Sequence, residues 1–177
     1  MEQRKGDNMD FLDFLKQRRS YRQYTGEPVE KELLDRIVEA GLLAPSGRNI
    51  KPEELIVVTD PKLLTQLSQC RKAGSQMLEG AGACIIVLGD EDKTDVWVED
   101  CSNVILTMHY MASSLGLGSC WINRAKEEFA SEEGKQLLKE WGIEGEYEGV
   151  GHCILGYADG PVPQAAPRKA NRVFYVK

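Results

Sequence analysis

The spacing of apolar side chains along this chain switches several times between a helical and an extended repeat. Helical spacing recurs in five segments, which predicts helices over residues 9–17, 30–43, 61–72, 96–115 and 127–141. Pro45 stops the second of these helices, and Pro61 suits the first turn of the third. The pattern over 96–115 is apolar over a wide arc, so we expect this helix to be central and buried.

Short apolar runs between these helices predict buried strands over residues 55–59, 83–88, 119–122 and 150–157. A Pro-rich segment follows the last of them, and the chain closes on a short β-prone end over 173–176. Helices and strands thus interleave within 177 residues, a length that suits one domain. We therefore expect a single domain over residues 1–177, built as an α+β sandwich or an α/β layer fold.

The chain is acidic, with 22 Lys and Arg against 28 Asp and Glu and a net charge of -6. This balance argues against non-specific binding of nucleic acid. No apolar run approaches a membrane span, and residues 1–10 do not resemble a signal peptide, so we expect a cytoplasmic protein without a membrane partner. Five widely spaced cysteines form no Cys-x-x-Cys pair and predict neither a disulfide framework nor a metal site.

Against this acidic background, three arginines surround one hydroxyl in Arg18-Arg19-Ser20-Tyr21-Arg22. Guanidinium forks and a hydroxyl are groups that bind phosphate. In an extended segment side chains alternate, so Arg18, Ser20 and Arg22 would share one face while Arg19 points the other way. The alternative is a solvated basic helix end, because cations are favourable at the C-terminus of a helix.

A second polar segment, Ala-Pro-Ser-Gly-Arg-Asn over residues 44–49, follows the helix predicted over 30–43. Gly47 permits a tight turn, and the Asn49 amide carries both donors and an acceptor, so it can pair with a ring edge that has both. Taken alone, the segment is more typical of a plain helix stop built from turn residues. Together, the two segments indicate a site for a phosphorylated planar ligand.

Four motifs, in order over nearly the whole chain, resemble those of the nitroreductase family of FMN-dependent oxidoreductases. They are Arg-Arg-Ser-x-Arg at 18–22, Ala-Pro-Ser-x-x-Asn-x-x-Pro at 44–52, Leu-Gly-Leu-Gly-Ser-x-Trp-Ile at 115–122, and Gly-Tyr with a later Pro-Arg-Lys between 156 and 169. The resemblance implies an α+β sandwich with a mostly antiparallel central sheet and an intertwined homodimer with FMN at its interface. It also implies ping-pong transfer of hydride from NADH or NADPH, through the flavin N5, to a small-molecule acceptor such as a nitroaromatic or a quinone.

Position by position, the resemblance implies that Arg18 and Ser20 hold the FMN phosphate, helped by Arg168 and Lys169 from the tail. Arg22 would lie near the pyrimidine side of the flavin ring, where a fixed cation stabilises negative charge on the reduced flavin. Arg19 belongs to the same cofactor-binding segment but faces the other way.

The remaining cofactor contacts implied by the resemblance come from two other places. Pro45, Ser46 and Asn49 would reach the flavin across the dimer interface, with Asn49 pairing with the ring edge. A strand would place three residues beside the ring near N5, namely Trp121, Ile122 and Asn123. No catalytic side chain and no metal is expected, because the flavin carries the chemistry.

The chain departs from the family pattern at Lys51-Pro52-Glu53, where many members have Gln-Pro-Trp, and it lacks the insertions that build substrate lids. Two other functions remain open. A non-redox protein that holds FMN or another phosphorylated ligand, as a sensor or a store, would need the same arginines. A specialised branch of the family, such as a dehalogenase or a flavin-fragmenting enzyme, is neither favoured nor excluded.

Several further polar residues are expected to have structural roles only. His109 and His152 lie in apolar segments without a spaced Asp or Cys partner. Cys120 is expected to pack beside the flavin site rather than to act as a redox thiol. Asp100 and Cys101 fall inside the long helix, and the sequence assigns them no chemistry.

Overall fold

The computed structural model describes residues 10–69, 75–123 and 125–177 of the chain. Helices α1 to α6 cover Phe11–Gln17, Lys31–Leu42, Pro61–Ser68, Trp97–Ser114, Ala125–Phe129 and Glu132–Glu140. Strands β1 to β4 cover Glu53–Val58, Ala83–Gly89, Gly118–Asn123 and Glu148–Gly156. Two short 3-10 turns, η1 at Gly47–Asn49 and η2 at Gln76–Leu78, lie between them.

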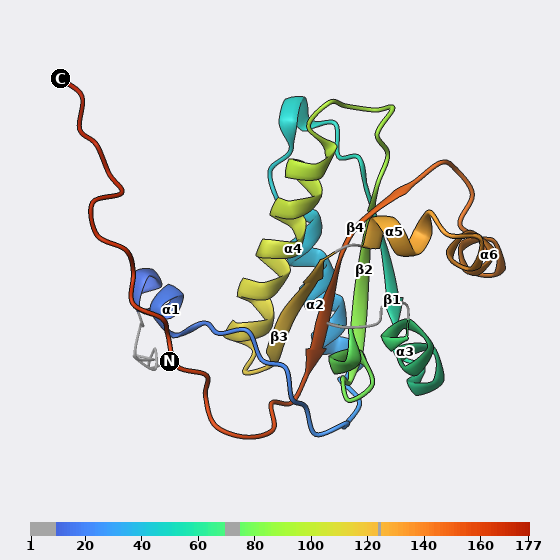
Figure 1. The fold of residues 1–177 in the computed structure, drawn as a ribbon, viewed down its shortest axis with the longest axis horizontal. Coiled ribbons are helices and arrows are strands. Elements are labelled where there is room, and N and C mark those ends of the chain that lie inside the picture. The colour runs from blue at the N-terminus through green and yellow to red at the C-terminus, as the bar shows by residue number, and fades with distance from the viewer. Residues whose placement is uncertain (1–9, 70–74, 124) are drawn as a thin grey trace, which may run out of the picture.

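The strands form one antiparallel sheet in the order β1-β2-β4-β3 (Figure 1). β2 is buried along its whole length, as expected of a strand covered on both faces. β3 lies at the edge, and its open side meets the chain that follows α1. There Ser20 forms a parallel bridge with Ser119, and the Tyr21 N–H donates to the Ser119 carbonyl at 3.0 Å. The expected α+β sandwich with an antiparallel sheet is confirmed.

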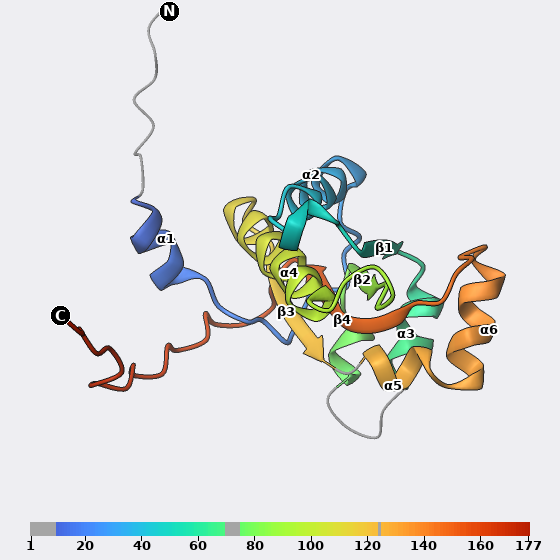
Figure 2. The same ribbon diagram turned by 90° about the horizontal axis from the view of Figure 1, so that it is seen from above.

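Helices cover the sheet in two layers, one on each face (Figure 2). Because side chains alternate along β2, its residues divide between two cores. Ile85 and Val87 face α2 and α4, in a core that includes Ile37, Val104, Ile105 and Met108. Ile86 and Leu88 face α3, α5 and α6, in a core that includes Leu64, Phe129 and Leu138. As predicted, the helix over 96–115 is central.

The single helix predicted over 127–141 is wrong, because the chain forms two helices, α5 and α6, in this stretch. Ser131 stands at the break. Its hydroxyl donates to the Glu128 carbonyl at 2.6 Å and accepts from the Gly134 N–H at 3.0 Å, so it caps the start of α6. α5 is largely buried, since Ala125, Glu128 and Phe129 are all covered.

The ends of the chain depart from the expected elements. The helix predicted over 9–17 begins at Phe11, and Met9 lies outside the described residues. The helix predicted over 61–72 ends at Ser68, and its last predicted residues also lie outside them. The β-prone end over 173–176 forms no strand and is 68% to 95% exposed. None of the described helices combines the length and the apolar character needed to cross a membrane.

Candidate functional site

Residues 18–22, called here the arginine segment, leave α1 in an extended conformation and lie along the open edge of β3. Ser20 and Arg22 line one pocket together with Asp159 and Pro163, and the Arg22 Nη1 donates to the Ser20 carbonyl at 3.5 Å. Burial raises the pKa of Cys120, while the charges of Arg22 and Arg18 and a hydrogen bond with Ser20 oppose that rise. Within the described part of the chain, neither the Arg18 guanidinium nor the Arg22 guanidinium is paired with a carboxylate. Two cations without carboxylate partners therefore stand two positions before and two positions after Ser20 in the chain.

The Arg19 guanidinium forms hydrogen bonds within its own chain. Its Nε donates to the Pro163 carbonyl at 3.1 Å, and its Nη1 donates to the carbonyls of Lys16 and Arg18 at 2.6 and 2.7 Å. These bonds fasten the start of the C-terminal tail to the end of α1. Arg19 thus has backbone carbonyls of its own chain as partners.

A buried imidazole lies beneath the arginine segment. His109 Nδ1 is 2.8 Å from Ser119 Oγ and 3.7 Å from Cys153 Sγ. Both neighbours can donate to Nδ1 or accept from it, so the contact suits either neutral tautomer of the ring. Burial lowers the pKa of His109 to about 4, helped by the charge of Arg18, so the ring is neutral at pH 7. Its Nε2 is buried with no partner among the described residues.

Residues 45–51, called here the asparagine turn, join α2 to β1 through η1. Pro45 and Asn49 are exposed and Ser46 is half-buried, so the turn presents polar groups to the outside. Arg48, Asn49 and Lys51 all have positive φ, between 54° and 57°. The Gly47 N–H donates to Asp100 Oδ1 of α4 at 2.8 Å. A turn of strained residues is thus held against the first turns of α4.

The arginine segment and the asparagine turn lie at opposite ends of α4 (Figure 1). The turn is bonded to Asp100 near the start of the helix, whereas the segment is bonded to Ser119, just beyond its end. α4 has 18 residues, which at 1.5 Å per residue spans about 27 Å. One chain therefore does not bring Asn49 beside Arg18 and Ser20.

β3 places its three predicted site residues differently. Trp121 is half-buried against Gly151, where a Cβ would overlap the indole Nε1, and this nitrogen is buried without a partner among the described residues. Ile122 is buried on the opposite face of the sheet, in the core with Phe129, so only its backbone is left for the strand edge. Asn123 is exposed at the end of the strand.

The basic pair of the tail is not gathered to the arginine segment. Arg168 and Lys169 are exposed, and neither forms a hydrogen bond or an ion pair with the described residues.

The four described cysteines are buried, which raises the pKa of the Cys101 thiol to about 12. Nowhere in residues 10–69, 75–123 and 125–177 do three His, Cys, Asp or Glu side chains gather in a way that could hold a metal ion.

Comparison with known proteins identifies this arrangement. A family model described as Nitroreductase family matches residues 15–157. The chain belongs to the nitroreductase family. A relative from Archaeoglobus fulgidus, provisionally named as an NADH dehydrogenase/NAD(P)H nitroreductase, is 35% identical over 133 residues, which cover 73% of this chain and 74% of the relative. The predicted resemblance is thus confirmed.

Two solved nitroreductases show how far the shared fold extends. An FMN-dependent nitroreductase from Clostridium difficile R20291 is 39% identical with a TM-score of 0.76, covering 85% of this chain and 88% of that one. A nitroreductase with bound FMN from Bacteroides fragilis NCTC 9343 is 26% identical with a TM-score of 0.84, covering 95% and 99%. The residues matched by the family model include the arginine segment, the asparagine turn and β3, whereas Arg168 and Lys169 lie beyond them.

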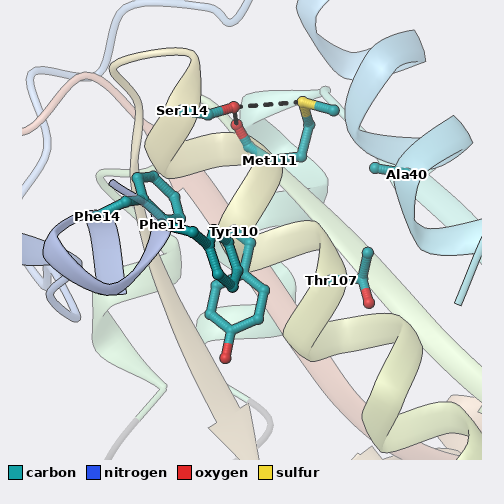
Figure 3. A pocket seen from close by; sticks show the side chains of 7 residues that line it. All are labelled: Phe11, Phe14, Ala40, Thr107, Tyr110, Met111 and Ser114. Carbon is teal, nitrogen blue, oxygen red and sulfur yellow. Dashed lines mark hydrogen bonds between the residues drawn. The ribbon is translucent and has the colours of Figure 1, made fainter. Parts of the chain in front are cut away.

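This member of the nitroreductase family also carries an apolar groove of about 360 Å³ where α1 meets α4 (Figure 3). Phe11 and Phe14 of α1 stack with each other and set their edges against Tyr110 of α4, with ring centroids 6.2 and 6.3 Å from the tyrosine. The other lining residues are Ala40, Thr107, Met111 and Ser114. Phe11 is 62% exposed and Leu12 is 57% exposed, so this face of the molecule presents large apolar side chains to the outside.

Two polar residues of α4, Asp100 and His109, contact segments of the candidate site although the sequence assigned neither of them a role there. Both lie on the buried stripe of the helix with Val104, Ile105 and Met108. The sequence did contain a signal for them. A carboxylate or an imidazole among the apolar residues of a buried helix face needs a hydrogen-bond partner, so such a residue is expected to contact another segment. The sequence could not supply those partners, since Gly47 is 53 positions away from Asp100 and Cys153 is 44 positions away from His109.

Proposed function

We propose that this chain is an FMN-dependent oxidoreductase that takes hydride from NADH or NADPH and passes it to a small organic acceptor, such as a nitroaromatic or a quinone. The observation that carries the proposal is the arginine segment. It holds two guanidiniums and a hydroxyl within five residues, neither guanidinium is paired with a carboxylate in the described chain, and the protein has a net charge of -6. The names of the relatives, which include FMN and NAD(P)H, support the same assignment.

The residues present fit a phosphorylated flavin. Arg18 and Ser20 would hold the phosphate, since a guanidinium and a hydroxyl both donate to phosphate oxygens. Arg168 and Lys169 would join the phosphate only if the exposed tail folds back or crosses to another molecule.

When bound, FMN would supply hydride transfer at N5, which no side chain of this protein supplies. The chain's own groups would position the ring and set the charge around it. Arg22 would place a fixed cation beside the ring, where it favours the reduced, more negative state. Trp121 and Asn123 would bound the ring from β3, and Asn49 would pair with its edge. Donor and acceptor would occupy the same space in turn, which predicts ping-pong kinetics.

We propose further that the site is completed by a second copy of the chain. Asn49 and Arg18 of one chain are separated by the length of α4, about 27 Å, so one ligand would meet the asparagine turn of a partner subunit. The exposed apolar face around Phe11, Leu12 and the groove over Tyr110 supports such an interface. The exposed apolar tail over 173–176 supports it too, because it finds no cover on its own chain.

Colour and bleaching test the proposed function. We expect the purified protein to be yellow, to bleach when NADH or NADPH is added without oxygen, and to regain its colour when a nitroaromatic or a quinone follows. A yellow protein that neither nucleotide reduces would instead be a flavin-binding protein without redox turnover. A protein that binds no FMN would remove both assignments.

A further inference from the structure

The asparagine turn is held in a conformation that its own residues do not favour. Arg48 and Lys51 have φ of 54° and 55°, in the left-handed region that residues other than Gly, Asn and Asp rarely adopt, and Asn49 has φ of 57°. Such strain persists only where surrounding structure over-determines it, and it clusters at functional sites. The groups that hold this turn are therefore candidates for a functional role.

α4 and the residues just before it supply most of these groups. Asp100 Oδ1 accepts from the Gly47 N–H at 2.8 Å, and Asn103 Nδ2 donates to the Pro45 carbonyl at 3.4 Å. The Arg48 guanidinium donates to Thr94 Oγ1 at 2.9 Å and pairs with Asp95 at 2.5 Å. The turn is thus tied at its beginning and middle to one rigid helix.

Close packing at Gly47 keeps the turn against that helix. A Cβ on this residue would lie 2.7 Å from Val96 Cγ2, which is too close for any side chain without a shift. Glycine at this position therefore lets the backbone N–H reach the Asp100 carboxylate. The contact depends on a close approach of turn and helix rather than on a flexible side chain.

Asp100 differs from the other ties in its burial. The side chains of Arg48 and Asp95 are 64% and 79% exposed, so their ion pair is screened by water. Asp100 is 4% exposed, and its bond to the Gly47 N–H lies where the dielectric is low. A charge-assisted bond in such surroundings is the strongest single constraint on the turn.

The second carboxylate oxygen of Asp100 lies close to the same turn. Its Oδ2 is buried and has no hydrogen-bond partner among the described residues. Both carboxylate oxygens lie 3.7 Å from the position that a Cβ on Gly47 would take, so the unused oxygen faces the turn as well. Burying a carboxylate costs more free energy than burying a neutral acceptor would. This cost argues that the asparagine turn has to be held in one exact position.

We propose that Asp100 is a positioning residue for the flavin ring, acting through the Gly47 N–H to fix the direction of Asn49. This inference rests on the proposed function, in which Asn49 pairs with the ring edge. Asp100 does not touch the ligand in this scheme. Its removal would let the turn relax toward conformations with negative φ, and Asn49 would meet the ring edge less often.

The experiment compares Asp100→Ala, Asp100→Asn and Asn49→Ala as FMN-loaded proteins. Asparagine keeps an acceptor of the same shape for the Gly47 N–H but loses the charge, so Asp100→Asn should slow flavin reduction less than Asp100→Ala does. Asp100→Ala should shift the flavin absorption spectrum and slow reduction by NADH or NADPH by roughly tenfold, the kind of loss that small misplacements cause. The double variant with Asn49→Ala should be no slower than Asn49→Ala alone.

Three controls separate positioning from general damage. Glu99→Ala removes an exposed neighbouring carboxylate of α4 and should leave the spectrum unchanged. The ratio of riboflavin to FMN dissociation constants, which reports the phosphate contacts, should stay at its wild-type value in Asp100→Ala. If Asp100→Ala does not fold, Gly47→Ala pushes the turn from the helix with Asp100 intact and should give the same spectral shift.

The outcomes are distinguishable from a failure of the proposed function. If the wild-type protein binds no FMN or is not reduced, the proposed function falls, and this inference falls with it. If the wild type is reduced and Asp100→Ala matches it in rate and spectrum, only the inference is overturned. Equal damage from Asp100→Asn and Asp100→Ala, or additive losses in the double variant, would also overturn it.

Discussion

His109 of α4 and Ser119 of β3 join the central helix to the edge strand through a contact of 2.8 Å between Nδ1 and Oγ. The same serine carries the backbone bridge to the arginine segment. A buried, neutral imidazole thus supports the strand on which the candidate phosphate-binding residues rest. Its protonation would place an uncompensated charge in the core, close to Arg18.

Stability should therefore fall as the pH drops below about 6.5. The folded state lowers the pKa of His109 from 6.5 to about 4, so between these values the unfolded chain binds more protons and is favoured as pH falls. The loss by pH 4 amounts to about 3 kcal/mol. Urea unfolding at pH 7 and at pH 5 measures it, and His109→Gln should flatten the dependence. The same pH dependence in both proteins would contradict this prediction.

Arg18→Ala should weaken FMN binding through loss of phosphate contacts. Hydrogen bonds to charged groups are worth about 1.5–3 kcal/mol each, which sets the expected loss. Titration with FMN and with riboflavin checks the cause, because riboflavin lacks the phosphate and should bind the variant as it binds the wild type. Arg36→Ala, on the exposed face of α2, is the matched control. Unchanged FMN affinity would remove Arg18 from the phosphate site.

Arg22→Gln should make the bound flavin harder to reduce. A cation beside the ring favours the reduced state, and because Arg22 is exposed the effect should not exceed about 1 kcal/mol. A spectroscopic titration against a reference dye measures the midpoint potential. Arg22→Lys keeps the charge and should stay close to the wild type. A potential that does not move in Arg22→Gln would place Arg22 away from the ring.

Phe11→Asp should separate the subunits and release FMN together. Phe11 is 62% exposed at the apolar groove over Tyr110, and a carboxylate there would have to be desolvated in an interface. Sedimentation velocity with detection of protein and flavin follows both events. Lys62→Asp, exposed on α3 in the other helix layer, serves as the control. A monomer that still holds FMN would show that one chain completes the site.

The spacing of apolar and polar residues predicted most helices and strands, because the residues that specify each one lie within that element. The apolar arc of α4, Pro61 at the start of α3 and the unbroken apolar run of β2 each act within one segment. The helix predicted over 127–141 was wrong because apolar spacing continues across the break. The stop depends on Ser131, whose hydroxyl bonds close α5 and open α6.

The sequence by itself determined the nitroreductase motifs and the sheet-and-helix class of the fold. These features depend on residue type and short spacing, which the chain carries directly. Only the tertiary structure decided which groups meet. It placed Asp100 under Gly47 and His109 under Ser119, and it set the arginine segment and the asparagine turn at opposite ends of α4. The physical reason is that α2 packs along α4 and takes the chain from one end of α4 to the other. The arginine segment and the asparagine turn, which are close in sequence, therefore lie at opposite ends of α4. A site that needs both segments requires a second copy of the chain.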